Sequence, residues 1–375
     1  MRLSVFFVLC SISLAFAQPK AAELSAERLR RIEAAVEAER VRQGVVGLTA
    51  GIASRGTTKW IAAFGKADLE NDVPTKPGTL FRTGSLAKPF TATAALQLWE
   101  RGKLDLDAPV QRYVPSFPEK QWGISVRKLL GHLGGIRHYR GEELDSTRHY
   151  KDLQEPLRIF SADALAHQPR TKYLYSSYGY NLAGAAVEAA AGVPFLDYLR
   201  ENILLPARME TTRDDNAWEI VANRTRWYSR AKAGHIINAH LADTSNKIPG
   251  GGLVTSAEDL LRFAAAWEQE KLLKRATMQM QTTRQKLADG SATGYGLGWN
   301  VSAVAGKQAI SHAGTQQGCR TILAMFPELK LTVVVLTNSD YADPVAFVDV
   351  ILKTLEAPSS MSRVNGVRRV VTRPN

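Results

Sequence analysis

Ser85 and Lys88 are three residues apart in the segment FRTGSLAKPF (81–90), where a helix is predicted to begin. Positions 85, 88, 92, 95 and 99 form one stripe at helical spacing, and this stripe becomes apolar after its first turn. We therefore expect the serine and the lysine to lie one turn apart at the head of a buried face. A lysine in such a place can accept the proton of a serine hydroxyl and make the serine a nucleophile.

The same pair also has a purely structural interpretation. Ser85 could cap the helix while Lys88 extends its ammonium group to solvent. Pro89 removes one backbone donor from the first turns, which leaves the start of the helix open. Gly102 follows the last turn and is a typical stop signal.

Two later segments carry further polar groups. The stretch YLYSSYGYNLAG (173–184) contains four tyrosines, and a tyrosine beside a lysine ammonium can have a lowered pKa and act as a general base. The stretch SHAGTQQG (311–318) follows a strand-like run whose backbone can bind a substrate, and His312 would supply a donor or a charge there. The alternatives are half-buried tyrosine packing and a histidine of the core or of a loop.

Other classes of site find no support in the sequence. The remaining histidines have no metal-ligand spacing, and neither a His-Glu-x-x-His helix nor a cysteine pair occurs, so we expect no metal and no other cofactor. No metal-finger spacing, phosphate loop or aromatic-basic signature indicates nucleic acid. The expected partner is a small-molecule or peptide substrate.

The two ends of the chain have distinctive compositions. MRLSVFFVLCSISLAFAQPK resembles a secretory signal peptide cleaved after Ala17, which predicts removal of residues 1–17 and a secreted or periplasmic protein.

After that cleavage Cys319 is the one cysteine that remains, so no internal disulfide can form, and we expect it to be a small buried strand residue. The net charge of +12 includes four arginines in the tail 357–375, which is predicted to be disordered and would favour weak attraction to anionic envelope surfaces.

Strand patterns occur near both ends of the chain, and helical patterns fill the middle. A hairpin at Arg55-Gly56 joins the strands VGLTAGIAS and TKWIAAFGKA, and four more strands follow in LGWNVSA, KQAISHAG, CRTILAMFP and LTVVVLTN. Helices are predicted in AELSAERLRRIEAAVEAERVRQG, in ADPVAFVDVILKTLEA, and in SAEDLLRFAAAWEQ with Ser256 as N-cap and Asp259 at the capping-box position.

We infer an α/β fold of the α+β type, with a central antiparallel sheet flanked by the N- and C-terminal helices and a mainly helical second lobe. The expected domain is 18–356, with a sheet lobe at about 24–82 and 266–356 and a helical lobe at about 83–265. Because the Ser85 helix opens the helical insertion, we expect Ser85 to lie at the cleft between the lobes.

The order Ser-x-x-Lys (85–88), Tyr-Ser-Ser (175–177) and His-x-Gly (312–314) resembles the three motifs of the serine beta-lactamase and penicillin-recognising superfamily. The resemblance extends from about residue 29 to 356 and is strongest for the class C branch. Within that branch, KLDLDAPVQRYVPSFPEKQW and HLGGIRHY look like the mitochondrial beta-lactamase-like group and its bacterial relatives.

This resemblance implies a role for each matching position. Ser85 would be the acyl-enzyme nucleophile and Lys88 its proton acceptor or electrostatic partner. Tyr175 would carry a proton to the leaving group and later activate water. His312 takes the place of the third-motif lysine or histidine.

The resemblance also implies a substrate-binding set. The N–H groups of Ser85 and Thr315 would form the oxyanion hole, beside Gly314. Ser177 occupies the position of the family's motif asparagine, which contacts the acyl amide of the substrate. Because a shorter hydroxyl weakens that contact, we do not expect efficient beta-lactam hydrolysis.

Three functions are compatible with these patterns. The leading prediction is a secreted serine hydrolase that acts through an acyl-enzyme on an amide, peptide or ester. The second is a catalytically quiet protein, either a penicillin-binding-type receptor or a self-assembling scaffold. The third is a basic envelope-binding module that acts through its arginine tail.

Overall fold

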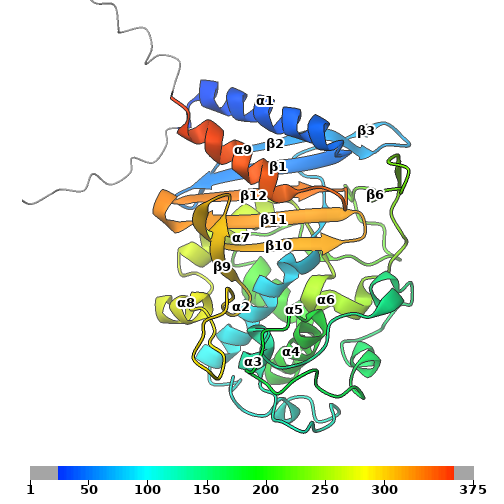
Figure 1. The fold of residues 1–375 in the computed structure, drawn as a ribbon, viewed down its shortest axis with the longest axis vertical. Helices are drawn as coiled ribbons and strands as arrows, with labels where there is room; N and C mark the ends of the chain where they lie inside the picture. The colour runs from blue at the N-terminus through cyan, green and yellow to red at the C-terminus, as the bar shows by residue number, and fades with distance from the viewer. Residues whose placement is uncertain (1–23, 359–375) are drawn as a thin grey trace, which may run out of the picture.

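The structure is a computed structural model that describes residues 24–358 (Figure 1). The predicted signal peptide lies outside the described residues, as does the predicted tail from residue 359 onward.

The central element is a 7-stranded antiparallel sheet in the order β3-β2-β1-β12-β11-β10-β9. The antiparallel sheet of the predicted fold class is therefore confirmed, together with the hairpin at Arg55-Gly56. The strands are β1 (Gly47–Ser54), β2 (Thr57–Asp68), β3 (Val73–Pro74), β9 (Asn300–Val304), β10 (Lys307–Gln316), β11 (Cys319–Phe326) and β12 (Leu331–Thr337).

Helices α1 (Ala26–Gln43) and α9 (Pro344–Glu356) lie side by side over one face of the sheet (Figure 1). Successive side chains of a strand point to opposite faces, so both faces must be covered to bury a continuous apolar strand. In β12, Val333 and Val335 join the core beneath α1 and α9, whereas Val334 and Leu336 join the core of the helical lobe. This double coverage explains the unbroken apolar run LTVVVLT.

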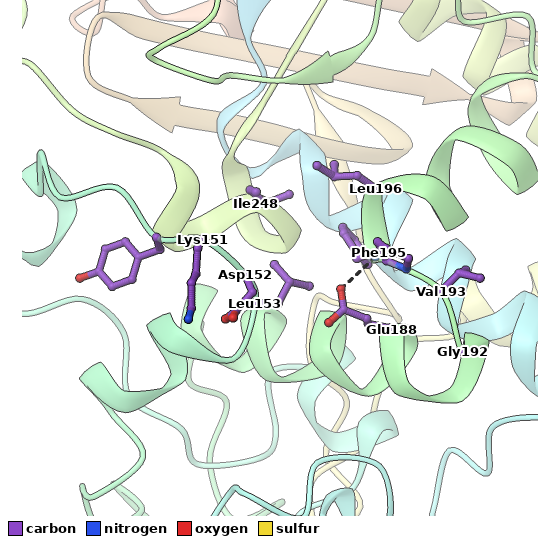
Figure 2. Close-up of a pocket in the computed structure, with 11 residues that line it drawn as sticks. Lys151, Asp152, Leu153, Glu188, Gly192, Val193, Phe195, Leu196 and Ile248 are labelled. Atoms are coloured by element: carbon purple, nitrogen blue, oxygen red, sulfur yellow. Dashed lines mark hydrogen bonds between the residues drawn. The ribbon is translucent and has the colours of Figure 1, made fainter.

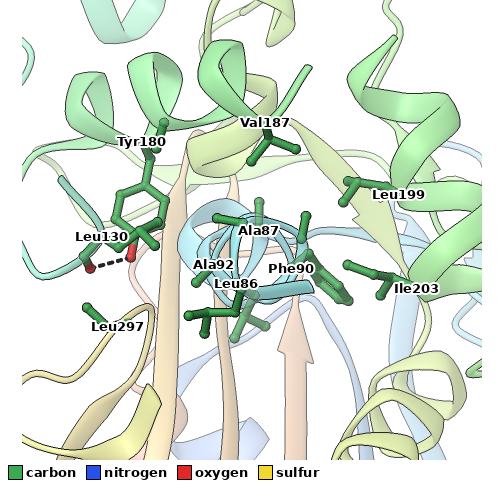
Figure 3. Close-up of a cluster of buried hydrophobic side chains, with 14 of the residues drawn as sticks. Leu86, Ala87, Phe90, Ala92, Leu130, Tyr180, Val187, Leu199, Ile203 and Leu297 are labelled. Carbon is green, nitrogen blue, oxygen red and sulfur yellow. Dashed lines mark hydrogen bonds between the residues drawn. The ribbon is translucent and has the colours of Figure 1, made fainter. Parts of the chain in front are cut away.

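Helix α2 (Ala87–Glu100) passes through the centre of the helical lobe, where neighbouring elements surround it (Figure 3). Its residues 87–98 are all buried. The predicted one-sided stripe is therefore wrong in two respects: the helix is buried nearly all round, and Trp99 at the end of the stripe is 39% exposed. A helix that is apolar on all sides belongs inside a lobe rather than on its surface.

The other helices are α3 (Val126–Leu130), α4 (Ser177–Ala191), α5 (Phe195–Leu199), α6 (Ile248–Gly251), α7 (Ala257–Glu268) and α8 (Arg275–Thr282). Ser256 caps α7 as predicted, since its Oγ accepts a hydrogen bond from the N–H of Asp259. Two small sheets were not predicted, β4-β8-β5 and β6-β7. Their strands are β4 (Phe81–Arg82), β5 (Arg213–Asp214), β6 (Tyr228–Arg230), β7 (Ile236–Asn238) and β8 (Leu253–Thr255).

Within residues 24–358 no single helix has both the length and the apolar character needed to cross a bilayer. One pair of segments, Ser177–Ala191 and Phe195–Leu204, meets the criterion together by length and composition, with a bend of 78° between them. Cys319 is buried at the start of β11, as expected.

Candidate active site

Ser85 lies in a 3₁₀ turn, η1 (Gly84–Leu86), immediately before α2. The prediction that the α-helix begins at Ser85 is therefore wrong, because the regular helix starts at Ala87. The tight turn lifts Ser85 out of the helix, and the serine is less buried than its neighbours.

Two glycines let this turn approach strand β10 closely. A Cβ atom on Gly314 would lie 2.0 Å from the carbonyl oxygen of Thr83, and a Cβ atom on Gly84, where φ is +49°, would lie 2.7 Å from the amide nitrogen of Thr315. Neither position tolerates a side chain without movement of the backbone. The close approach brings the Thr315 amide beside the turn that carries Ser85.

Lys88 is fully buried one turn into this segment, at 0% exposure. Its Nζ lies 3.0 Å from Ser85 Oγ, 3.0 Å from Ser177 Oγ and 2.7 Å from the carbonyl oxygen of Gly250. Within the described part of the chain it forms no salt bridge, so no negative charge offsets the loss of hydration of an ammonium group. Burial therefore lowers the pKa of Lys88 well below its usual value, which favours the neutral amine, and Nζ is aimed at a serine hydroxyl.

The backbone next to Tyr175 is held by residues 131–140, which lie in the chain between α3 and the 3₁₀ turn at Gly141–Asp145. Ser176 caps α4, with its Oγ accepting from the N–H of Gly179 and donating to the carbonyl of Arg137. The N–H groups of Ser176 and Ser177 donate to Nδ1 of His132 (3.1 Å) and of His138 (3.2 Å). Two histidine rings thus fix the backbone on which Tyr175 sits.

The pKa of Tyr175 is raised, mainly by burial, although a hydrogen bond with the Ser85 side chain partly opposes the rise. The expected lowering of this pKa by a neighbouring ammonium is therefore wrong. Lys88 Nζ does lie 4.8 Å from the centre of the Tyr175 ring, but burial disfavours the ammonium form that would stabilise a phenolate. Tyr175 is a neutral hydroxyl in contact with the nucleophile.

His312 is buried on the face of β10 that points to the helical lobe, and its ring centre lies 6.4 Å from that of Tyr175. Nδ1 lies 2.7 Å from the carbonyl oxygen of Ala313 and Nε2 lies 2.8 Å from the hydroxyl of Tyr295, so both ring nitrogens are occupied. Burial lowers the pKa of His312 to about 3. The expectation that His312 offers a charge to a substrate is therefore wrong, because the ring is neutral.

Ser177 connects Lys88 to a second tyrosine. Ser177 is 3% exposed and hydrogen-bonds to Lys88 on one side and to the hydroxyl of Tyr139 on the other. Ser177 is the residue that, by the sequence resemblance, takes the position of the family's motif asparagine. The polar chain therefore runs from Ser85 through Lys88 and Ser177 to Tyr139.

These groups line one cavity of about 350 Å³. All seven sequence-predicted site residues meet here, with Lys88 and Gly314 in its wall and the other five at its surface. The residues lining the cavity are Gly84, Ser85, His138, Tyr139, Leu144, Tyr175, Ser177, Lys247, Gly250, Gly251, Asn300, His312, Ala313, Thr315 and Gln316.

A larger cavity of about 510 Å³ lies elsewhere in the helical lobe, between residues 150–153 and the loop that joins α4 to α5 (Figure 2). Its polar groups include Lys151 and Glu188, and Glu188 accepts a hydrogen bond from the backbone of Phe195. Serine and cysteine are absent from its lining. We therefore place the chemistry in the smaller cavity.

Among the lining residues of the smaller cavity, sequence reasoning missed five polar ones: His138, Tyr139, Lys247, Asn300 and Gln316. The histidine and tyrosine lie in HLGGIRHY, a stretch that the family resemblance did single out, so their proximity to the site had a signal. Gln316 likewise lies in SHAGTQQG, directly after Thr315. Lys247 belongs to no motif and reaches the cavity only through the tertiary fold.

A buried lysine amine aimed at a serine hydroxyl is the arrangement that can activate a serine as a nucleophile. The chain belongs to the Beta-lactamase family, whose model matches residues 30–356. Its relatives include the serine beta-lactamase-like protein LACTB, mitochondrial, of Homo sapiens, with 30% identity over 82% of this chain and 72% of that protein. Esterase EstB of Burkholderia gladioli is also 30% identical, over 86% of this chain and 94% of the esterase.

A likeness among solved structures supports the fold. The D-amino acid amidase from Ochrobactrum anthropi SV3, complexed with D-phenylalanine, superposes with a TM-score of 0.78 at 24% identity, covering 88% of this chain and 99% of the amidase. The fold class predicted from the sequence and its assignment to the penicillin-binding and beta-lactamase superfamily are both confirmed.

Proposed function

We propose that this protein is a serine hydrolase that transfers the acyl group of an amide, peptide or ester to Ser85 and then to water. The observation that carries the proposal is the 3.0 Å contact between Ser85 Oγ and the buried amine of Lys88. An amine whose pKa is lowered by burial has a free lone pair at a pH where an exposed lysine would be protonated. The esterase and the amidase among its relatives support hydrolysis as the outcome.

In the acylation step, Ser85 Oγ attacks the carbonyl carbon while its proton moves to Lys88 Nζ. The N–H groups of Ser85 and Thr315 hold the negative charge that develops on the carbonyl oxygen. The bond to the leaving group then breaks, and the leaving nitrogen or oxygen takes the proton from Lys88 through the hydroxyl of Tyr175. The raised pKa of Tyr175 suits a relay that always carries a proton.

In the deacylation step, Lys88 is again a neutral base. A water molecule loses its proton toward Lys88 through the Tyr175 hydroxyl and attacks the ester carbon. Ser85 leaves with the proton that Lys88 has taken up. Ser177 and the carbonyl of Gly250 hold the amine in place through both steps.

Incubation with a fluorophosphonate and with a fluorescent penicillin, followed by intact mass spectrometry, tests this proposal beside Ser85→Ala. We expect one adduct on the wild-type protein and none on the variant. Undiminished labelling of Ser85→Ala would overturn the assignment of the nucleophile. A penicillin adduct that decays with time indicates a hydrolase, whereas one that persists indicates a penicillin-binding-type receptor.

We also propose that the hydrolase acts outside the cytoplasm. The support is the sequence pattern of residues 1–17 alone. Mass spectrometry of the protein from a native or heterologous bacterial host tests it: a mature N-terminus at Gln18 is expected, and an intact N-terminus in the cytoplasmic fraction would contradict it.

A further inference from the structure

A second lysine, Lys247, lines the same cavity and takes no part in the proposed acyl transfer. It precedes α6 and is 1% exposed. Its Nζ donates to the carbonyl oxygen of Leu144 at 2.6 Å and lies 5.5 Å from the centre of the Tyr139 ring. An ammonium group has three donors, so this single acceptor leaves two of them for another partner.

The acidic side chains around Lys247 are already committed to other groups. Asp215 pairs with Arg82 at 2.7 Å and with Arg224 at 3.2 Å. Asp243 accepts from His149 and from the backbone of Ser245, and Asp145 accepts from the amide of Gln317. Across residues 24–358, Lys247 itself forms no salt bridge.

Gln316 provides a second, independent donor in the same cavity. The side chain is 3% exposed, and its Nε2 has no hydrogen-bond partner within residues 24–358. Its Oε1 lies close to Gly251, which also lines the cavity. A buried amide N–H₂ without an acceptor costs free energy, which a ligand oxygen would recover.

The rest of the lining defines the sign of the ligand. None of the residues that line the cavity is an aspartate or a glutamate, and the two lining histidines, His138 and His312, are neutral because burial lowers their pKa values to about 4 and about 3. The protonated form of Lys247 therefore faces a cavity whose lining residues carry no negative charge.

We infer that Lys247 and Gln316 form an anion subsite, so that the proposed hydrolase prefers substrates whose reacting acyl group carries a carboxylate. That the bound anion belongs to a substrate rests on the proposed function, but the subsite itself is a property of the cavity. The ammonium supplies charge and two N–H donors, and the amide supplies a further N–H donor to the second carboxylate oxygen.

Paired coumarin esters test the inference. Monoesters of glutaric, adipic and pimelic acid are each compared with a fatty-acid ester of equal chain length, and the ratio of kcat/KM within each pair is measured. We expect one anionic ester to be preferred about tenfold or more, which is the size of effect that a hydrogen bond to a charged group produces. A ratio near or below one for all three pairs would overturn the inference.

Two variants assign the preference to the subsite. Lys247→Met removes the charge at similar volume, and Gln316→Glu places a carboxylate beside the lysine, so both should bring the ratio to about one or lower. Lys151→Met, at an exposed lysine of the larger cavity, is the matched control and should keep the wild-type ratio (Figure 2). Retention of the preference in Lys247→Met would exclude the lysine as its source.

A binding measurement separates this inference from the proposed function. Calorimetric titration of Ser85→Ala with adipate and with the neutral adipamide needs no turnover, and tighter binding of adipate that is lost in Ser85→Ala/Lys247→Met supports the subsite even if no ester is cleaved. Equal binding of the two compounds, together with normal fluorophosphonate labelling of the wild-type protein, would reject the subsite and leave the hydrolase intact.

Discussion

Lys88 is the residue on which the proposed chemistry depends. Its three polar neighbours are two hydroxyls and one carbonyl, and none of them carries a charge that would keep the amine protonated. The environment is therefore arranged for a base rather than for an ion pair. This differs from Arg82, which is also buried but is paired with Asp215 at 2.7 Å.

Replacement of Lys88 by methionine should slow the labelling of Ser85 by a fluorophosphonate by roughly 10²–10⁴-fold, the usual contribution of a positioned general base. The second-order rate constant of labelling, followed by intact mass, is the measurement. Lys103→Met, at an exposed lysine just beyond α2, serves as the control and should label at the wild-type rate. Equal rates for Lys88→Met and wild type would show that another group accepts the proton.

The labelling rate should fall as the solution is acidified. Lys88 is active as the neutral amine, so its protonation below the lowered pKa removes the base, whereas an exposed lysine would already be protonated at neutral pH. His138 and His312, with pKa values of about 4 and about 3, stay neutral above pH 5 and cannot cause a decline there. Lys247, whose pKa is lowered to about 7, is the other lysine of the cavity that titrates in this range. The pH profile of labelling between pH 5 and 10 should contain an acid limb that does not depend on Lys247.

Lys247→Met and His312→Gln test whether another group of the cavity causes that limb. Both variants should keep the limb, even if their rates are lower. Disappearance of the limb in Lys247→Met or in His312→Gln would assign the titration to that residue and contradict the account of Lys88.

At the scale of elements, the site is formed where the η1 turn meets strand β10. The two elements are separated by more than two hundred residues in the chain, and they approach closely because Gly84 and Gly314 lack side chains. The side chain of Thr321 on β11 adds a hydrogen bond to the carbonyl of Thr83 at 2.9 Å. The proposed oxyanion hole is thus a product of this one contact.

Gly314→Ala tests the contact. The new Cβ atom would lie 2.0 Å from the Thr83 carbonyl, so the strand must move away from the turn and carry the Thr315 amide with it. We expect Ser85 labelling to slow by about 10²–10³-fold, the cost of losing one oxyanion donor. Gly123→Ala, whose Cβ would meet nothing within 4 Å, is the control. An unchanged rate in Gly314→Ala would exclude Thr315 from the oxyanion hole.

The large elements were predictable from the sequence because their patterns are long. The strands at both chain ends and helices α1, α7 and α9 all lie where periodicity and capping residues place them. The small sheet β4-β8-β5 was not predictable, since strands of two or three residues have no period. The start of α2 was misplaced because the 3₁₀ turn that precedes it has only 3 residues, too few to show a period that differs from that of an α-helix.

The same limit applies to the site. Ser85 and Lys88 are detectable because one turn of helix brings them together, and Tyr175 and His312 because their motifs follow in order. Lys247 contacts Leu144, 103 residues away, and no local pattern records that proximity. The neutral state of His312 was likewise hidden, because it arises from burial against Tyr295 and not from its neighbours in sequence.

On the scale of the whole molecule, the two apolar cores on either side of the sheet stabilise the fold, so its interior can contain buried lysines that lower the stability. Lys88 and Lys247 are both buried without a salt bridge to any described carboxylate. Burying a charge is unfavourable unless it is paired, so each lysine lowers the stability of the fold. Function, rather than stability, is the reason to keep them.

Lys247→Met should therefore stabilise the protein while it removes anion preference. Burial lowers the pKa of Lys247 from 10.5 to about 7, so the folded state binds this proton more weakly than the unfolded chain does. The resulting loss of stability is absent above pH 10.5, grows as the pH falls, and is fully present below about pH 7. Urea unfolding should give Lys247→Met a free energy of unfolding roughly 1–4 kcal/mol above wild type at pH 7.

The gain should shrink at pH 10, because this pH is close to the pKa of 10.5 of the unfolded lysine, so its loss of the proton on folding costs little free energy. A variant that is less stable than wild type by the same amount at both pH values would show that the side chain is kept for packing and its hydrogen bond to Leu144. A gain in stability at pH 7 combined with loss of the carboxylate preference would instead identify a residue retained at the expense of the fold, as expected for a group that binds substrate.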